Sequence, residues 1–527
     1  MKLFFPKHIF LILKIVFSFF LLFFLIKLIL YHYHLIIDPF QAEYREGASI
    51  TMTSALIKGL NPYALENQPQ YTNDYGILYS LFVYPFAKCF GVTLLVHRWV
   101  NAFLIGLSCL FLIFVMQRLE IPLLLSLSGA LLFYASLLFP RTTTACATPS
   151  PLGVLLFLLS VFLPWLDRYS WRSIFWSVFL GLLAYFTKPY FILCIPLIGS
   201  YIFFFVSKKK GLWIAGLSLL FFVLSLFAAG KIFECYFNNC YFIHTNATPL
   251  SPEHLNRQID WYLKLHKPLL MLLVAGLAAI FFRNLKNGAQ TIRPLGKALK
   301  EFLSKIHINQ FDRPLIDLPC PLTFYCAVIV WIVLILSLGK HIGALLWYFF
   351  HLLSPFLIVY ALWILSRFSF WPIGVLPFLV WNLSVITVDH DYQRLTADTA
   401  VWSELKKQIS NYNNILNSPI VAAFLVEQNK PIFDNGLSEY FKIGGYRYSF
   451  NKRFFKPDGR IIHRYYQYLN EIKQMVRTKQ FDLILLTEGY APFAPVELPN
   501  YYQYLGTVKL SLPHCFLDFN VTIWQSK

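Results

Sequence analysis

Long apolar runs recur along the first 388 residues of this chain. Hydrophobic residues make up 57% of the sequence and charged residues only 13%, against roughly 25% charged residues in a soluble globular protein. A helix that crosses a bilayer needs about 20 predominantly apolar residues. In hydrocarbon, its backbone polar groups must be satisfied within the segment itself. The pattern therefore predicts a polytopic all-α membrane protein.

Eleven of these runs predict transmembrane helices. They lie near residues 8–30, 94–116, 121–139, 151–166, 173–188, 190–206, 212–230, 267–282, 319–338, 345–365 and 371–388. Another run, 76–90, is shorter and contains Pro85 and Lys88, which favours a helix lying on the membrane surface. The short runs 173–188 and 190–206 flank Lys188-Pro189, so they predict a broken or hairpin element.

The distribution of basic residues predicts an orientation. The formal charge is +19, but Lys and Arg are spread over loops and a tail rather than gathered in one stripe, which argues against a nucleic-acid partner. Alternate loops carry Lys208 to Lys210, Arg168 with Arg172, and the basic stretch 283–313. Because cytoplasmic loops are enriched in Lys and Arg, we expect these loops and the N-terminus to be cytoplasmic. The acidic loop 31–75 and the C-terminus would then lie outside.

The composition changes after residue 388. Residues 389–527 are polar and mixed in charge, so they predict a small α/β extracytoplasmic domain beside a membrane domain of residues 1–388. The segments Ile420 to Val426 and Phe481 to Leu486 are expected to be buried strands, and Ile461 to Val476 a helix.

The cysteines and the common nucleotide-binding and protease motifs give little information about the function of this chain. Of nine cysteines, only Cys235 and Cys240 lie together in an expected outer loop. A disulfide between them stays open, because sequence does not fix its geometry. The chain has no C-x-x-C pair, no Walker A loop and no H-E-x-x-H motif, so an ATPase or zincin has no support.

The candidate catalytic residues follow the first apolar run, in the stretch D-P-F-Q-A-E-Y-R-E-G. Asp38 and Glu43 are carboxylates that could remove a proton from an acceptor hydroxyl, and desolvation beside a bilayer would raise their pKa. Arg45 could hold a phosphate through two hydrogen bonds. The alternative is a solvated loop with local ion pairs.

Two further groups are candidates for substrate binding. Asp74 could serve as a second acid or a metal ligand, and Tyr79 could stack on a sugar, although tyrosines also anchor helices at membrane interfaces. Cations at the outer edges of the expected helices could stabilise a phosphate leaving group, or could simply extend to lipid headgroups. These cations are Arg98, Arg141, Lys188 and Lys340, with His341 beside the last.

These residues resemble the polyprenyl-phosphate-dependent glycosyltransferases of the GT-C superfamily, in particular the bacterial aminoarabinose transferases and the protein O-mannosyltransferases. Glu43-Tyr44-Arg45 and the later Gly59 are similar to the family's Asp-Glu-x-Arg loop, which ends in a glycine. The stretch Tyr79 to Gly91 with His97-Arg98 resembles its surface helix and following arginine, and Thr187-Lys188-Pro189 its Thr-Lys-Gly. The chain departs from the family pattern where Ala42 replaces the first acid and Asp74-Tyr75-Gly76 replaces Lys-Pro-Pro.

The resemblance implies a GT-C fold and an inverting transfer of sugar from a polyprenyl-phosphate carrier. The acceptor would be a glycolipid, glycan or protein on the outer side of the membrane. Glu43 or Asp38 would be the base, while cations hold the lipid phosphate. The family implies a bacterial inner membrane. A divalent metal is compatible with the sequence but is not required by it, and neither the sugar nor the acceptor is specified.

Two other classes remain open. A transporter or flippase of lipid-linked sugars would place charged residues in the middle of several helices and break helices near the midplane. Here the ionisable residues lie at the expected outer edges, apart from Lys14 and Lys27. A membrane-anchored binding protein would use residues 390–527 and leave the acids of the first loop without a role.

Overall fold

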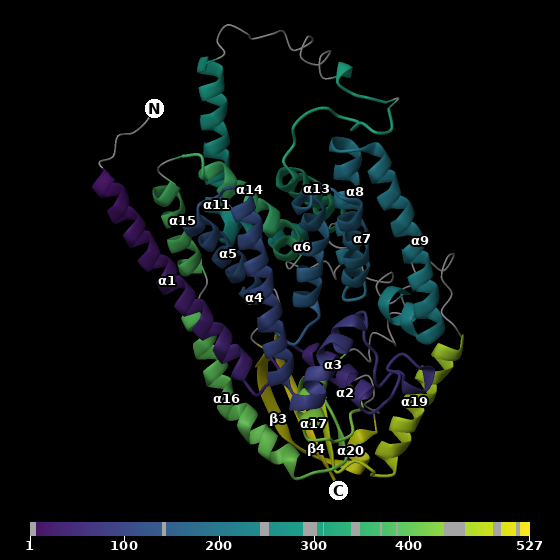
Figure 1. Cartoon of the computed structure of the whole chain (residues 1–527). Helices are drawn as coiled ribbons and strands as arrows, with labels where there is room; N and C mark the ends of the chain where they lie inside the picture. The colour runs from purple at the N-terminus through teal and green to yellow at the C-terminus, as the bar shows by residue number, and fades with distance from the viewer. Residues whose placement is uncertain are drawn as a thin grey trace.

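The computed structural model describes residues 7–139, 144–242, 252–287, 303–308, 310–338, 348–368, 371–385, 388–436, 459–487, 497–512 and 517–527. Within these residues, a bundle of helices stands on a smaller α/β layer that contains the C-terminus (Figure 1). The first helix starts at the opposite end of the bundle and descends to the α/β layer (Figure 1).

Each expected membrane run contains a helix. The helices are α1 (Lys7–Ile37), α4 (Leu94–Arg118), α5 (Leu123–Leu138), α6 (Ser150–Leu166), α7 (Trp171–Tyr185), α8 (Cys194–Phe205), α9 (Lys208–Ile232), α11 (Pro252–Asn287), α13 (Leu322–Leu338), α14 (Ser354–Leu365) and α15 (Trp371–Val385). Only four described segments, within α1, α4, α9 and α11, are long and apolar enough to cross a bilayer unaided. The predicted number of eleven crossings is therefore not confirmed.

The ends of these helices follow local sequence signals. The Thr93 side chain accepts a hydrogen bond from the backbone N–H of Val96 and caps α4. Ser170 and Ser207 cap α7 and α9 in the same way. The expected break between 188 and 190 is present, because α7 ends at Tyr185 and a 3₁₀ turn, η3 (Pro189–Leu193), precedes α8.

The expected surface helix is α3 (Leu78–Phe90), and it ends at Gly91, whose positive φ of 92° suits glycine. A second short helix, α2 (Glu46–Ile57), precedes it and is buried along most of its length. Both lie where the bundle meets the α/β layer (Figure 1). This junction holds the loop that carries the predicted catalytic acids.

The α/β layer contains a four-stranded sheet in the order β1-β2-β4-β3. The strands are β1 (Ile415–Leu416), β2 (Leu483–Thr487), β3 (Tyr502–Leu512) and β4 (Leu517–Ser526). β1 pairs parallel with β2, and the other pairs are antiparallel. The chain enters the layer through α16 (Val388–Ser410), so the predicted domain boundary after residue 388 falls at the start of this helix.

Two of the three element predictions for this layer are confirmed. The segment Phe481 to Leu486 corresponds to β2, and Ile461 to Val476 lies within α19 (Gly459–Arg477). The strand prediction for Ile420 to Val426 is wrong, because this segment forms the 3₁₀ turn η6 (Pro419–Val421) and the helix α17 (Ala422–Glu427). In a short run that is buried on every side, hydrophobic residues do not recur with the period of a strand (2) or of a helix (3.6), so the sequence does not distinguish a strand from a helix.

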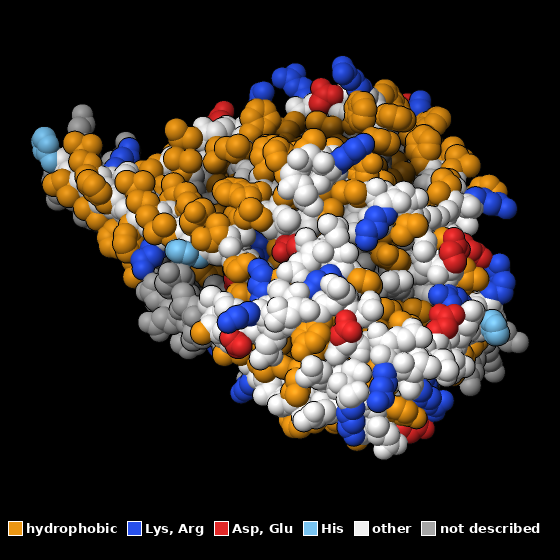
Figure 2. Space-filling model, turned by 90° about the horizontal axis from the view of Figure 1, so that it is seen from below, with side chains coloured by type: hydrophobic (Ala, Val, Ile, Leu, Met, Phe, Trp, Pro, Cys, Tyr) orange, Lys and Arg blue, Asp and Glu red, His pale blue; other side chains and the backbone are white. Residues whose placement is uncertain are grey.

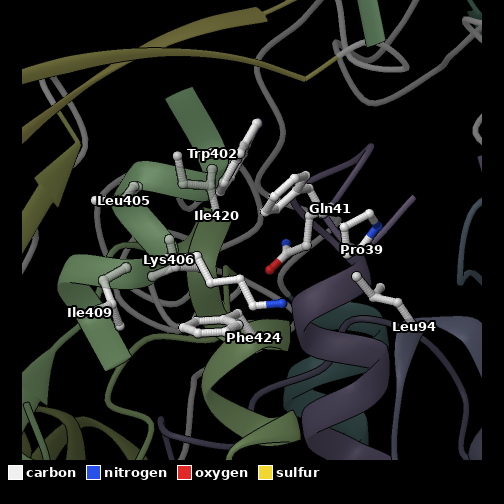
Figure 3. A pocket seen from close by; sticks show the side chains of 11 residues that line it. Pro39, Gln41, Leu94, Trp402, Leu405, Lys406, Ile409, Ile420 and Phe424 are labelled. Atoms are coloured by element: carbon white, nitrogen blue, oxygen red, sulfur yellow. The ribbon is translucent and has the colours of Figure 1, made fainter. Parts of the chain in front are cut away.

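The α/β layer contacts the loop that follows α1 and the first residue of α4. Gln41 accepts a hydrogen bond from the backbone N–H of Ala423 at 2.9 Å, and Glu427 accepts one from the N–H of Leu94 at 2.8 Å. Phe40 stacks on Trp402 with ring centroids 5.1 Å apart. Figure 3 shows the narrow apolar hollow at this contact, with side chains of α16 and α17 facing Gln41.

Charged residues lie at both ends of the described structure. Seen from the α/β end, acidic and basic residues are mixed among uncharged polar groups, and apolar side chains cover the helices behind (Figure 2). At the opposite end, basic loops meet, since Lys210 donates to the Tyr169 carbonyl and the backbone N–H of Lys208 to the Arg313 carbonyl. The basic loops predicted to share one side therefore come together there.

The disulfide left open between Cys235 and Cys240 is not formed. Neither thiol takes part in a disulfide, and both side chains are buried. They also pack in different apolar clusters, Cys235 with residues of α19 and Cys240 with Tyr63 and Tyr236.

Candidate functional site

Arg98 fixes the loop that follows α1 to the start of α4. Its Nε and Nη2 atoms donate to the two carboxylate oxygens of Glu46 at 2.9 and 2.8 Å. Nη1 donates to the carbonyls of Leu35 and Asp38 at 2.8 and 2.6 Å, and Nη2 donates also to the carbonyl of Phe40 at 2.7 Å. A guanidinium has five N–H donors, and all five are engaged by the end of α1, the loop that follows it and the first residue of α2.

Glu46 is the matching anion and also binds two backbone segments. Its Oε2 accepts the N–H of Ala42 and its Oε1 the N–H of Ala147, both at 2.7 Å. Burial alone would raise the pKa of Glu46, but the Arg98 charge and these hydrogen bonds outweigh it and hold the pKa below its ordinary value. The pair thus joins the loop after α1, α4 and the segment before α6.

Asp38 lies beside this pair and is only partly buried. Its Oδ1 accepts the backbone N–H of Phe40 at 3.1 Å. Burial raises the pKa of Asp38 to about 6, although the nearby Arg98 charge opposes the rise. A carboxyl whose pKa is higher in the folded protein than in the unfolded chain makes folding less favourable once it ionises.

We therefore expect Asp38→Asn to stabilise the protein at pH 7.5 and to have no effect near pH 4. The folded chain holds the Asp38 proton up to about pH 6, whereas the ordinary value is 3.8, so the cost of ionisation develops between these two pH values. The melting temperature in detergent should rise by about 2 °C at pH 7.5. Asp260→Asn, at an exposed carboxylate, is the control. A stabilisation that is equal at both pH values would contradict the burial of this charge.

Glu43 and Arg45 form a second buried ion pair. Arg45 Nε donates to Glu43 Oε1 at 2.6 Å, and the Arg45 backbone N–H donates to Glu43 Oε2 at 2.7 Å. Arg45 Nη1 donates to the Tyr75 hydroxyl at 3.3 Å. The Glu43 side chain is fully buried, whereas 11% of the Arg45 side chain is exposed. The alternative interpretation of this loop was a solvated segment with local ion pairs. The ion pair is present, but it is buried rather than solvated.

Lys188 and Asp74 join the Glu43–Arg45 pair. The Lys188 ammonium lies over the Tyr75 ring, 4.3 Å from its centroid. Lys188 is 2% exposed and lies within electrostatic reach of Arg45, Asp74 and Glu43. Burial, with the nearby Arg45 charge, lowers the pKa of Lys188 to about 7. Four ionisable side chains, two acidic and two basic, therefore share one buried region, which we call the Glu43–Lys188 cluster (Glu43, Arg45, Asp74 and Lys188).

Backbone contacts bring Lys188 to this region. The N–H of Gly76 donates to the Thr187 carbonyl at 3.1 Å, and the N–H of Leu78 donates to the Phe186 carbonyl at 3.2 Å. A Cβ at position 76 would lie 1.9 Å from the Phe186 carbonyl oxygen, so only glycine permits this approach. The segment that departs from the family pattern, Asp74-Tyr75-Gly76, thus packs on the segment that resembles it, Thr187-Lys188-Pro189.

Among the predicted residues not yet placed, the structure describes only Tyr79. Tyr79 is buried in α3, and its hydroxyl bonds His97 Nδ1 at 3.3 Å while the two rings meet edge to face. It therefore packs inside the protein rather than offering a face to a sugar. Arg141 and His341, like Lys340, lie outside the described residues. The described residues contain no group of three or more His, Cys, Asp or Glu side chains that could hold a metal ion.

One polar group beside the cluster was not predicted as a site residue. His351 is fully buried in the π-helical turn η5 (Phe349–Leu353), which precedes α14. Its Nδ1 bonds the Tyr190 hydroxyl at 3.1 Å and its Nε2 the Thr144 hydroxyl at 2.5 Å. The signal for it in the sequence is a histidine within an apolar run, where a polar group is costly unless it has partners.

Comparison with known proteins rests on structure. No family model matches the sequence, and no curated protein sequence matches it significantly. The crystal structure of ArnT from Cupriavidus metallidurans bound to undecaprenyl phosphate superposes on 95% of this chain and 97% of the ArnT chain. The TM-score is 0.51 at 10% sequence identity. This chain has the fold of ArnT. The predicted GT-C fold is thereby confirmed, and with the apolar helices it makes the chain an integral membrane protein.

Proposed function

We propose that this protein is a membrane glycosyltransferase that moves a sugar from a polyprenyl-phosphate carrier to an acceptor hydroxyl. The observation that carries the proposal is the Glu43–Lys188 cluster. It places a carboxylate and two cations together at the edge of an apolar helix bundle. The ArnT-like fold supports the choice of lipid carrier, because that neighbour binds undecaprenyl phosphate.

The cluster offers the two kinds of group that the reaction needs. Glu43 takes the proton from the acceptor hydroxyl as it attacks the anomeric carbon, which inverts that centre. Lys188 and Arg45 stabilise the negative charge that develops on the polyprenyl phosphate as the sugar–oxygen bond breaks. The carrier's hydrocarbon tail remains among the membrane helices. The acceptor is a glycolipid, a glycan or a protein.

The geometry changes the roles proposed for two predicted residues. Arg98 has all five donors engaged within the protein, so we propose that it holds the loop rather than a phosphate. Asp38 lies with Arg98 and Glu46 rather than with Lys188, so Glu43 is the stronger candidate for the base. Asp74, within the cluster, is a second carboxylate that can orient the sugar.

Orientation follows from the two ends of the molecule. The end with Lys208, Lys210 and Arg313 carries short loops that contain Lys and Arg, and we assign it to the cytoplasm by the positive-inside rule. The N-terminus is then cytoplasmic, while the cluster and the C-terminal domain are extracytoplasmic. Such an enzyme fits a bacterial inner membrane.

The distribution of buried charge favours an enzyme over a flippase. The buried Asp, Glu, Lys and Arg side chains of the described residues are Glu43, Arg45, Glu46, Asp74, Arg98, Lys188, Lys208 and Asp434. All except Lys208 lie at the end of the bundle that meets the α/β layer, and Lys208 lies at the basic end. A carrier for lipid-linked sugars would use charged groups near the membrane midplane.

We expect Lys188→Met to weaken binding of undecaprenyl phosphate by roughly 100-fold, since a hydrogen bond to a charged group contributes about 1.5–3 kcal/mol and a buried ion pair adds to it. Binding is measured on purified protein in detergent, with undecaprenol as the ligand that lacks a phosphate. Lys231→Met, at an exposed lysine on the same end of the molecule, should bind like wild type. Equal affinity of wild type for the phosphate and the alcohol would remove the proposal.

A further inference from the structure

His351 connects three separate segments around the Glu43–Lys188 cluster. Thr144 belongs to the segment before α6, Tyr190 to η3 and His351 itself to η5. The imidazole also lies parallel to the Phe191 ring, with centroids 6.2 Å apart and an interplanar angle of 18°. Neither ring nitrogen is therefore spare, and the ring cannot rotate without losing all three contacts.

The three segments are packed so tightly that their positions depend on one another. A Cβ at Gly153, in the first turn of α6, would lie 2.1 Å from the Phe191 ring and 2.6 Å from the Thr187 hydroxyl. This contact presses α6 against the residues on either side of Lys188. A π-helical turn of the kind that holds His351 is found frequently at functional sites.

Tyr190 reaches toward the cluster. It lies within electrostatic reach of Arg45 and Tyr75, while His351 lies within reach of Lys188. The Tyr190 hydroxyl is thus at the border between the imidazole and the cations that the proposed function assigns to the lipid phosphate. A hydroxyl there can donate one hydrogen bond to a phosphate oxygen, provided that its proton is used neither by His351 nor by the Ser150 hydroxyl, which also lies within hydrogen-bond reach.

We propose that His351 is a positioning residue that directs the Tyr190 hydroxyl proton to the phosphate of the lipid carrier. In this arrangement Nδ1 carries the imidazole proton and donates to the Tyr190 oxygen, and Nε2 accepts from the Thr144 hydroxyl. The Tyr190 O–H then donates to a phosphate oxygen next to Lys188. This role rests on the proposed function, and it adds a neutral donor to the two cations of that site.

The test uses side chains that reproduce one ring nitrogen each. The amide of His351→Asn occupies the place of Nδ1 and can still donate to Tyr190, whereas the amide of His351→Gln reaches the place of Nε2 and keeps only Thr144. We expect His351→Gln and Tyr190→Phe each to weaken binding of undecaprenyl phosphate roughly tenfold, as for one hydrogen bond to a charged group. His351→Asn should stay within about threefold of wild type, and all three should bind undecaprenol as wild type does.

The double variant His351→Gln with Tyr190→Phe should be no weaker than either single variant, because both remove the same donor. His463→Gln, at an exposed histidine of α19, is the control. Equal losses for His351→Asn and His351→Gln, accompanied by a lower melting temperature, would show a role in packing only and overturn the inference. Unchanged phosphate binding in His351→Gln would also overturn it while leaving the proposed function intact. If the wild-type protein has no affinity for undecaprenyl phosphate, both the proposed function and the role of His351 are contradicted.

Discussion

Replacing Glu43 by Gln is expected to lower the rate of sugar transfer by roughly 100- to 10,000-fold, the range that a positioned general base contributes. Glutamine keeps the shape of the side chain and can still accept the bond from the Arg45 backbone N–H, but it breaks the buried ion pair with Arg45 Nε, so the melting temperature of the variant is measured beside its rate. Gln cannot take a proton from an acceptor hydroxyl. The loss should therefore appear in kcat, with the KM for the lipid donor little changed.

Substitutions of two other acidic residues test whether the loss in Glu43→Gln comes from a missing base or from any change of charge. Asp38→Asn should retain activity within about tenfold, because Asp38 lies outside the Glu43–Lys188 cluster, and tenfold is well below what a lost base costs. Glu66→Gln, at an exposed acid in the same loop, should match wild type. The rates are measured in single-turnover reactions at saturating donor. If Asp38→Asn loses activity and Glu43→Gln keeps it, the base has been assigned to the wrong carboxylate.

The second large effect concerns folding. Arg98→Met should destabilise the protein by about 3–5 kcal/mol, because it leaves Glu46 ionised and buried without its counter-charge. It also removes the donors to three backbone carbonyls at the end of α1 and in the loop that follows it. We expect little monodisperse protein in detergent and a much lower melting temperature. Arg118→Met, at the exposed opposite end of the same helix, should behave like wild type.

A double-mutant cycle distinguishes the ion pair from the separate side chains. Glu46→Leu combined with Arg98→Met should be more stable than Arg98→Met alone, since no buried charge is left unpaired. It should remain less stable than wild type, because the N–H groups of Ala42 and Ala147 lose their acceptor. If Arg98→Met melts like wild type and loses only its affinity for undecaprenyl phosphate, Arg98 is a phosphate ligand, as the sequence predicted.

The helices could be predicted from sequence because the bilayer imposes a minimum apolar length on each crossing. The run that begins at residue 94 shows this well, since it is long, apolar and preceded by the capping Thr93. The segment Ile420 to Val426 shows the limit. It is buried in an apolar cluster that joins the loop after α1 and α2 with α16 and the sheet. Contacts on several sides of this kind leave no period in the sequence.

The site could be predicted only in part. Glu43, Arg45 and Glu46 are conspicuous as charged residues beside an apolar run, but their partners are not. Arg98 binds Glu46 across 52 residues of sequence, and Lys188 reaches Tyr75 only because Gly76 lets two backbone segments approach. The roles of Arg98 and Asp38 thus depend on which charges share a region, a property of tertiary structure.

Reconstitution into liposomes with undecaprenyl-phosphate-linked sugars tests the central proposal most directly. The measured quantity is the release of undecaprenyl phosphate when an acceptor is supplied on the side of the α/β domain, compared between wild type and Glu43→Gln. We predict release by wild type and very little by the variant. Movement of the intact lipid-linked sugar across the bilayer, with no release of undecaprenyl phosphate and no effect of Glu43→Gln, would contradict the account.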